Sequence, residues 1–118
     1  FAHLARQRAG ALIVESDPYF NGLVERFVAL ATQHSVAVIY PRREFTTAGG
    51  LMSYGTSLTE AYRQIGIYAG RILKGDKASE LPILLPTRFE LVVNLKAANA
   101  LGLTLPTSIL LRADEVIE

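Results

Sequence analysis

Cysteine and tryptophan are absent from this chain of 118 residues, and methionine occurs once. Without cysteine there is no disulfide, no thiolate nucleophile and no zinc–sulfur site. The formal net charge is only +1, because 12 Lys and Arg residues are scattered among 11 Asp and Glu residues. This balance gives no electrostatic reason to expect nucleic acid or an anionic membrane as a partner. The apolar runs are also far shorter than the roughly 20 residues that span a bilayer.

Catalytic signatures are equally scarce. The run from Leu51 to Gly55 resembles the turn that presents a nucleophilic serine, but Leu51 stands where that motif needs glycine. The two histidines, His3 and His34, are both expected at helix ends, without the carboxylate spacing of a metal site. No glycine-rich phosphate loop occurs. We therefore expect no enzymatic activity, no metal and no cofactor.

The composition is that of a folded globular protein, with 50% hydrophobic and 19% charged residues. A chain of this length buries about two thirds of its unfolded surface, which is enough for one core. We therefore expect a single domain over residues 1–118. Because residues 1–8 look like the end of a helix, we interpret the chain as part of a longer protein.

Short apolar runs alternate with amphipathic segments along the chain. We expect strands over residues 11–14, 36–40, 51–54 and 89–93. We expect helices from Pro18 to about His34, over 42–49, over 58–73, from Asn94 to Gly102 and after Pro106. This alternation indicates an α/β fold, namely a three-layer αβα sandwich with a mostly parallel sheet.

The stretch from Gly50 to Lys74 is the most informative part of this pattern. A strand breaks at Gly55, and the next helix begins with the capping box Ser57-x-x-Glu60. In a capping box the serine hydroxyl accepts from the third helical N–H, while the glutamate reaches back to the serine N–H. A strand, a glycine turn and a capped helix can hold a small polar ligand at the strand's carboxyl end. The pattern therefore predicts a binding crevice.

The order and spacing of these segments resemble one family over essentially the whole chain. The residues that carry the resemblance are 11–55, from ALIVESDPYF to GLMSYG, the helix end ILKG at 72–75, and LPTRFELVVNLKAANALGL at 85–103. They resemble the substrate-binding components of ABC importers, in the group related to tryptophan- and tyrosine-binding proteins. The resemblance implies the type I periplasmic-binding-protein fold, in which two α/β lobes joined by crossing segments hold a ligand between them. It covers the C-terminal lobe and the last crossovers.

The resemblance also implies a function and a place. Such a protein captures a small polar solute, such as an amino acid or a related carboxylate, in the bacterial periplasm and delivers it to a membrane permease. It implies that Asp17 faces the cleft and meets the ligand's amino group, and that the helix over 58–73 packs against the other lobe. Pro18 and Tyr19 follow Asp17 where aromatic-amino-acid binders tend to have a small polar residue, which argues against tryptophan or tyrosine as the ligand.

Each candidate ligand residue also has a purely structural interpretation. Asp17 is a helix cap, a partner for a ligand ammonium, or both. Tyr19, Tyr40 and Tyr54 either stack on a ligand or pack near the hinge, and Arg42 either clamps a ligand carboxylate or lies in solvent. The predicted ligand-binding residues are Asp17, Pro18, Tyr19, Tyr40, Arg42, Ser53, Tyr54 and Gly55.

One alternative function shares the same fold. The effector-binding domain of a sugar-repressor-like transcription regulator has this architecture, and an upstream helix-turn-helix would identify it. The apolar face of the helix over 58–73 further predicts that these 118 residues alone associate as a homodimer and bind ligand weakly or not at all.

Overall fold

The computed structural model describes residues 1–118, apart from the side chain of Ala5. The chain divides into two compact units. One consists of Phe1–Gly55 together with Glu90–Glu118, and the other of Thr56–Phe89. The first unit carries the sheet and the predicted ligand-binding residues.

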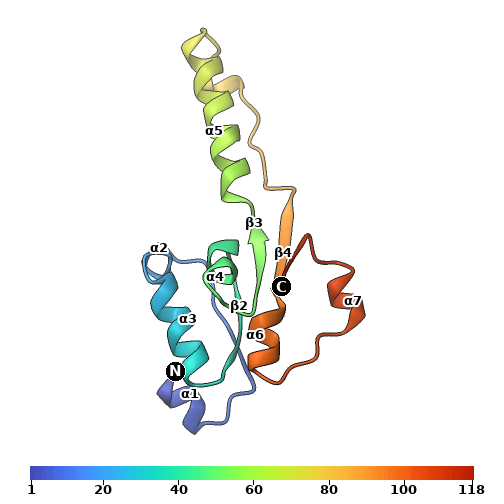
Figure 1. Cartoon of the computed structure of the whole chain (residues 1–118). Helices are drawn as coiled ribbons and strands as arrows, with labels where there is room; N and C mark the ends of the chain where they lie inside the picture. The colour runs from blue at the N-terminus through green and yellow to red at the C-terminus, as the bar shows by residue number, and fades with distance from the viewer. The chain divides into compact units, whose positions relative to one another are not determined.

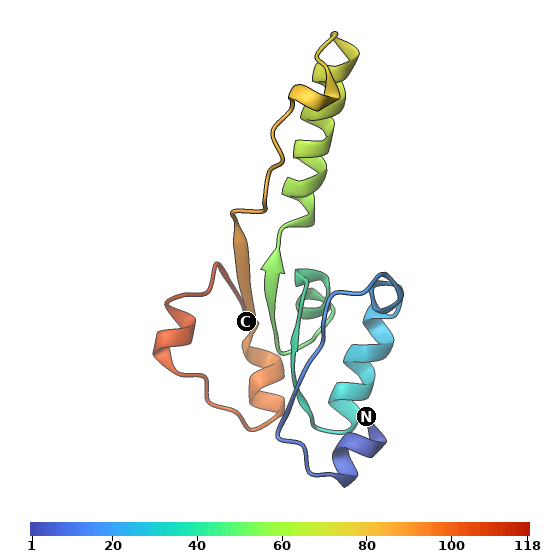
Figure 2. The ribbon, with the colours of Figure 1, turned by 180° about the vertical axis from the view of Figure 1, so that it is seen from behind.

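The sheet has five strands in the order β1-β2-β3-β4-β5. Their bounds are Ala11–Ile13, Ala37–Tyr40, Met52–Thr56, Phe89–Asn94 and Glu115–Ile117. β1, β2 and β3 are parallel, and β4 and β5 are parallel to each other. The Asn94 N–H donates to the Leu51 carbonyl at 2.9 Å, so β4 ends where β3 begins and runs against it (Figure 1, Figure 2). The predicted α/β fold with a mostly parallel sheet is confirmed.

The helices agree with most of the expected segments. They are α1 Ala2–Arg6, α2 Pro18–Asn21, α3 Val24–Gln33, α4 Arg43–Thr47, α5 Leu58–Leu73, α6 Leu95–Ala100 and α7 Thr107–Leu110, with a 3₁₀ turn at Ala78–Glu80. Asn94 caps α6 as predicted, because its side chain accepts from the Ala97 N–H. Gly75 and Gly102 follow α5 and α6 with positive φ angles, the left-handed conformation that often ends a helix.

The core of the first unit lies between the sheet and helices α3 and α4. Val28 and Ala31 of α3 pack with Val38 and Tyr40 of β2 and with Phe45 of α4. The rings of Tyr40 and Phe45 stack with centroids 4.7 Å apart and planes inclined by 10°. Burial of this apolar face is the main stabilisation that the unit gains from α3 and α4.

The single helix expected from Pro18 to about His34 is wrong, because it is two helices. α2 ends at Asn21, where the Gly22 N–H donates to the Phe20 carbonyl, and α3 begins at Val24. Asparagine and glycine are both weak helix formers. The break lets the Phe20 ring pack on Phe27, with centroids 5.1 Å apart.

The chain also does not break at Gly55, since β3 continues to Thr56. Glycine is needed there for a close approach: a Cβ on Gly55 would lie 1.9 Å from the carbonyl oxygen of Pro41. The acidic end of the chain forms β5, which was not expected from the sequence. Val116 of β5 pairs with Val93 of β4.

The second unit is built around α5. The Ser57 hydroxyl caps α5 by accepting from the Glu60 N–H at 3.3 Å, as predicted. The Glu60 carboxylate, however, accepts from Arg63 and Gln64 on its own helix, so only half of the capping box forms. The Tyr68 hydroxyl donates to the Pro82 carbonyl at 2.6 Å and ties the returning chain to α5.

We expect Gly55→Ala to destabilise the protein by about 1–3 kcal/mol, because the added methyl group meets the backbone of Pro41. Urea unfolding followed by circular dichroism measures the change. Gly10→Ala is the matched control, since a Cβ on Gly10 meets nothing within 4 Å, and it should change stability by less than about 0.5 kcal/mol. Equal stability of the two variants would contradict the close approach at Gly55.

Candidate functional site

The candidate site lies at the edge of the sheet where β1, β2 and β3 end. Because these strands are parallel, their carboxyl ends lie at the same edge. Ile13 pairs with Ile39 and Tyr40 with Ser53, so the chain segments that follow the three strands emerge together. We call this region the site edge. It comprises residues 17–19 after β1, residues 42–44 after β2, Tyr54 and Gly55 of β3, Glu90 of β4, and Asp114 and Glu115 at the start of β5. It is the position at which open α/β sheets bind ligands.

The ends of β2 and β3 bring five of the eight predicted residues together. Tyr40 and Ser53 are each only 1% exposed and belong to the core. Arg42 and Tyr54 follow them, and Tyr54 is 54% exposed. Gly55 touches the Pro41 carbonyl, which fixes how closely the two strand ends approach. At this point Tyr54 and Arg42 are the side chains that solvent reaches.

The end of β1 supplies the other three predicted residues. Asp17 is exposed, and its carboxylate accepts from the Tyr19 N–H at 2.8 Å. Pro18 opens α2, as expected for a proline at the first position of a helix. Tyr19 is 72% exposed, with its ring edge-on to Phe20 at 6.0 Å, while Phe20 packs on the core. Asp17 is therefore a helix cap whose carboxylate remains open to solvent.

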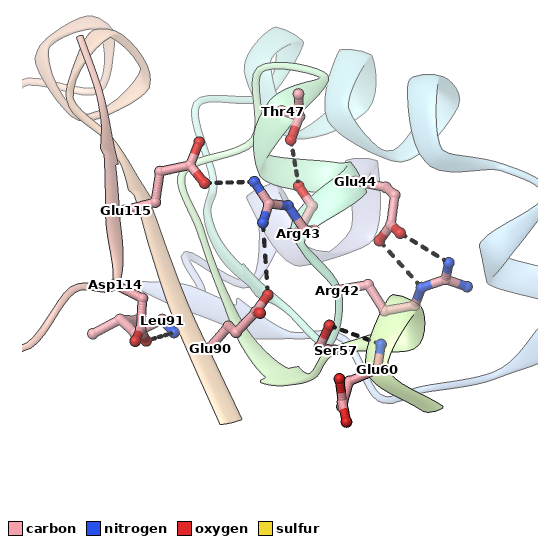
Figure 3. Close-up of polar contacts among 10 residues, drawn as sticks. All are labelled: Arg42, Arg43, Glu44, Thr47, Ser57, Glu60, Glu90, Leu91, Asp114 and Glu115. Atoms are coloured by element: carbon pink, nitrogen blue, oxygen red, sulfur yellow. Dashed lines mark hydrogen bonds and ion pairs between the residues drawn. The ribbon is translucent and has the colours of Figure 1, made fainter. Parts of the chain in front are cut away.

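Two arginines at the site edge are engaged by carboxylates of the chain itself (Figure 3). Arg42 donates from Nε and Nη2 to the two carboxylate oxygens of Glu44, both at 3.2 Å. Arg43 forms an ion pair with Glu115 and a second with Glu90 at 3.7 Å. Partial burial by itself raises the pKa of Glu44, but the hydrogen bonds and charge of Arg42, with the charge of Arg43, hold that pKa below its usual value.

Three acidic residues at this edge could not be assigned to it from the sequence. Glu90 is the second residue of β4, Asp114 precedes β5, and Glu115 opens β5. These strands begin at the site edge because they run against β1–β3. Asp114 and Leu91 form two hydrogen bonds with each other. The Asp114 carboxylate accepts from the Leu91 N–H, and the Asp114 N–H donates to the Leu91 carbonyl. The only signal in the sequence is the apolar pair Val116–Ile117 within the acidic segment, which is too short to predict a strand by itself.

Tyr40 has an unusual environment for a predicted ligand residue. Its hydroxyl is buried and has no hydrogen-bond partner among the described residues, and the same holds for the Ser53 hydroxyl. Burial raises the pKa of Tyr40 to about 12, because the ionised phenolate is poorly solvated there. The role of Tyr40 and Ser53 in ligand binding stays a prediction, since both side chains are packed in this structure.

A pocket of about 290 Å³ lies at the opposite end of the strands, between α3 and α6. Its walls include Val28 and Ala31 of α3, Leu51 before β3, and Ala97 and Leu101 of α6. Of the eight predicted residues only Tyr40 lines it. Within the described residues, no group of three or more acidic or histidine side chains is placed to hold a metal. In the same part of the chain, no helix has the length and apolar character needed to cross a membrane.

Comparison with known proteins gives a family and a set of similar folds. A family model described as ABC transporter substrate binding protein matches residues 2–117. A conserved domain protein from Vibrio cholerae has a TM-score of 0.87 at 24% identity, over 97% of this chain and 38% of that chain. The ABC domain in complex with L-Trp from Streptococcus pneumoniae has a TM-score of 0.84 at 23% identity, over 98% and 41%.

A third structure is the ligand-free, open form of a substrate-binding protein with adhesive properties from Clostridium difficile. It has a TM-score of 0.63 at 21% identity, over 98% of this chain and 39% of that chain. The chain thus spans 38–41% of the length of these three structures, with which it shares its fold. A search of curated proteins found none that matches this chain.

We expect Tyr40→Phe to leave stability at pH 7 unchanged or to raise it by up to about 1 kcal/mol. The substitution removes a buried hydroxyl that forms no hydrogen bond, so no hydrogen bond is lost. Above pH 10 the unfolded tyrosine ionises while the folded one, with its pKa of about 12, stays neutral. The wild type should therefore lose about 1 kcal/mol per pH unit relative to the variant between pH 10 and 12.

Urea unfolding at pH 7 and at two pH values above 10 measures both effects. The other tyrosines titrate equally in the two proteins, so only the difference between them reports on Tyr40. A variant that is destabilised at pH 7 would contradict the unpartnered hydroxyl.

Proposed function

The chain belongs to the family of ABC transporter substrate-binding proteins, and on this premise we propose that it captures a small polar solute for import. The sheet-bearing unit, Phe1–Gly55 with Glu90–Glu118, would form the C-terminal lobe, and Thr56–Phe89 would belong to the crossing segments and the other lobe. Such a receptor works outside the cytoplasm, and in a bacterium with two membranes that place is the periplasm. Its partner is the membrane permease of the same importer.

One observation carries this proposal, namely the exposed Asp17 carboxylate at the site edge, where the rings of Tyr19 and Tyr54 are also exposed. Asp17 caps α2 with one oxygen and forms no ion pair among the described residues. Tyr19, two residues after Asp17, is 72% exposed, and Tyr54 within β3 is 54% exposed. A carboxylate with aromatic surfaces suits a solute that carries an ammonium group and an apolar body. An amino acid or a related amine has both features.

The mechanism follows from capture between two lobes. Solute that contacts both lobes favours the closed form and shifts the open–closed equilibrium by its difference in affinity for the two forms. The closed receptor is then the form that the permease recognises, and another subunit of the importer hydrolyses ATP. The chain itself catalyses no reaction in this scheme. The comparisons do not support the homodimer expected from the sequence, and the proposal does not include it.

We expect a solute of the right class to raise the melting temperature of the complete two-lobed protein. At a hundred times its dissociation constant a ligand adds about 2.7 kcal/mol, which corresponds to a shift of several degrees. The screen compares amino acids, small carboxylates and sugars by thermal shift. Amino acids should give the shift, and Asp17→Asn should abolish it.

Asparagine caps a helix about as well as aspartate, so Asp17→Asn removes the charge and keeps the cap. Glu25→Gln, an exposed change from carboxylate to amide on α3, is the matched control and should keep the full shift. If Asp17→Asn retained the amino-acid shift, the cap would be the only role of Asp17. If no solute gave a shift, the proposed solute class would be wrong.

A further inference from the structure

Arg42 is the residue at the site edge that is chemically best suited to bind a solute's carboxylate, yet Glu44 already occupies it. A guanidinium group pairs most strongly with a carboxylate through two parallel N–H donors. Arg42 uses Nε and Nη2 in this way, and both reach Glu44 oxygens at 3.2 Å (Figure 3). The Arg42 side chain is only 23% exposed, which limits approach to its other donors. A carboxylate from solution would have to displace Glu44.

Displacement of Glu44 is unfavourable for two reasons. Glu44 lies two residues from Arg42 in the same chain, so its effective concentration at the guanidinium far exceeds that of a dilute solute. Its pKa also lies below the usual value, so it stays ionised and paired at neutral pH. The pair as a whole carries almost no net charge, which weakens the long-range attraction of another anion.

Arg43 does not offer a second free guanidinium group for a solute's carboxylate. Its guanidinium is engaged by Glu90 and Glu115, which reach it from β4 and β5. Both arginines of the site edge are thus neutralised within the described chain, while Asp17 has no cationic partner there. The charge left over at the site edge is therefore negative.

We propose that Glu44 determines the specificity of this lobe: it blocks carboxylate recognition at Arg42, so the lobe selects solutes by a positively charged amine at Asp17. This inference rests on the proposed solute-binding function. It predicts which half of an amino acid this lobe recognises, the ammonium and not the carboxylate. A solute's carboxylate, where present, must be bound by residues outside this chain's site edge.

The test is Glu44→Gln in the complete two-lobed protein, with three related probes measured by calorimetry. The probes share the indole ring of the L-Trp bound to the similar protein from Streptococcus pneumoniae, although Pro18 and Tyr19 argue against tryptophan as the solute of this chain. L-Tryptophan carries both charged groups, tryptamine lacks the carboxylate, and indole-3-propionate lacks the ammonium. The variant should bind indole-3-propionate about tenfold more tightly than the wild type, the gain expected for one charged hydrogen-bonding partner. Tryptamine binding should stay within about twofold. An unchanged affinity for indole-3-propionate, or equal gains for both probes, would overturn the proposal.

Two further variants separate a change at Arg42 from a general change of charge. Glu44→Asp keeps a carboxylate beside Arg42 and should keep indole-3-propionate as weak as in the wild type. Glu60→Gln makes the same substitution in the Arg63–Glu60 pair of α5, which has the same two-donor geometry, and should leave all three affinities unchanged. Tighter indole-3-propionate binding by Glu60→Gln would show that lost negative charge alone explains the effect.

A titration with sodium acetate tests the proposal even if no indole compound binds. The Nε–H resonance of Arg42 in a ¹⁵N NMR spectrum should shift saturably with acetate in Glu44→Gln and stay unshifted in the wild type. Equal shifts in both proteins would overturn the role of Glu44. Failure of all three indole probes, combined with an acetate response in the variant only, would support the role of Glu44 and would count only against an indole-bearing solute.

Discussion

Asn94 ties together four segments of the sheet-bearing unit. Its N–H donates to the Leu51 carbonyl at 2.9 Å, which places the end of β4 beside the start of β3. Its side chain donates to the Thr46 carbonyl of α4 at 3.3 Å and accepts from the Ala97 N–H of α6 at 3.0 Å. The residue is only 5% exposed. Loss of its amide would leave buried donors and acceptors unpaired in two helices, which costs more than the hydrogen bonds themselves contribute.

The charges of the site edge depend on α4, and α4 depends on the core. Phe45 and Thr46 of this five-residue helix are fully buried, and Thr46 is the residue that Asn94 holds. Arg43 and Glu44 lie on the same short helix, so they face outward where β2 ends. A helix this short has little stability of its own in water. Its packing on the sheet is therefore what keeps each arginine within reach of its carboxylate partners.

Sequence alone was sufficient where a feature depends on local periodicity or a local cap. The helix over residues 58–73 and the caps at Asp17 and Asn94 are of this kind. The sequence alone was not sufficient where a contact depends on residues far away in the chain, or where two partners compete for one side chain. The Arg43–Glu115 pair joins residues 72 apart, and β5 is too short to be recognised without the strand it pairs with. The Glu60 carboxylate pairs with Arg63 and not with the Ser57 backbone N–H of the predicted capping box, because the charge-assisted hydrogen bond is the stronger interaction. The strand ends of the site were predictable, whereas the acidic residues brought there by the reversed strands were not.

Because β3 and β4 are neighbours that run in opposite directions, the chain leaves the sheet and returns beside its own point of departure. The segment Thr56–Phe89 is therefore an insertion between two paired strands. The entropy of closing such a loop grows slowly, by about 0.6 kcal/mol for each doubling of its length. Proteins of this topology can thus diverge in this segment, by exchange or change of length, while the sheet that carries the site keeps its register.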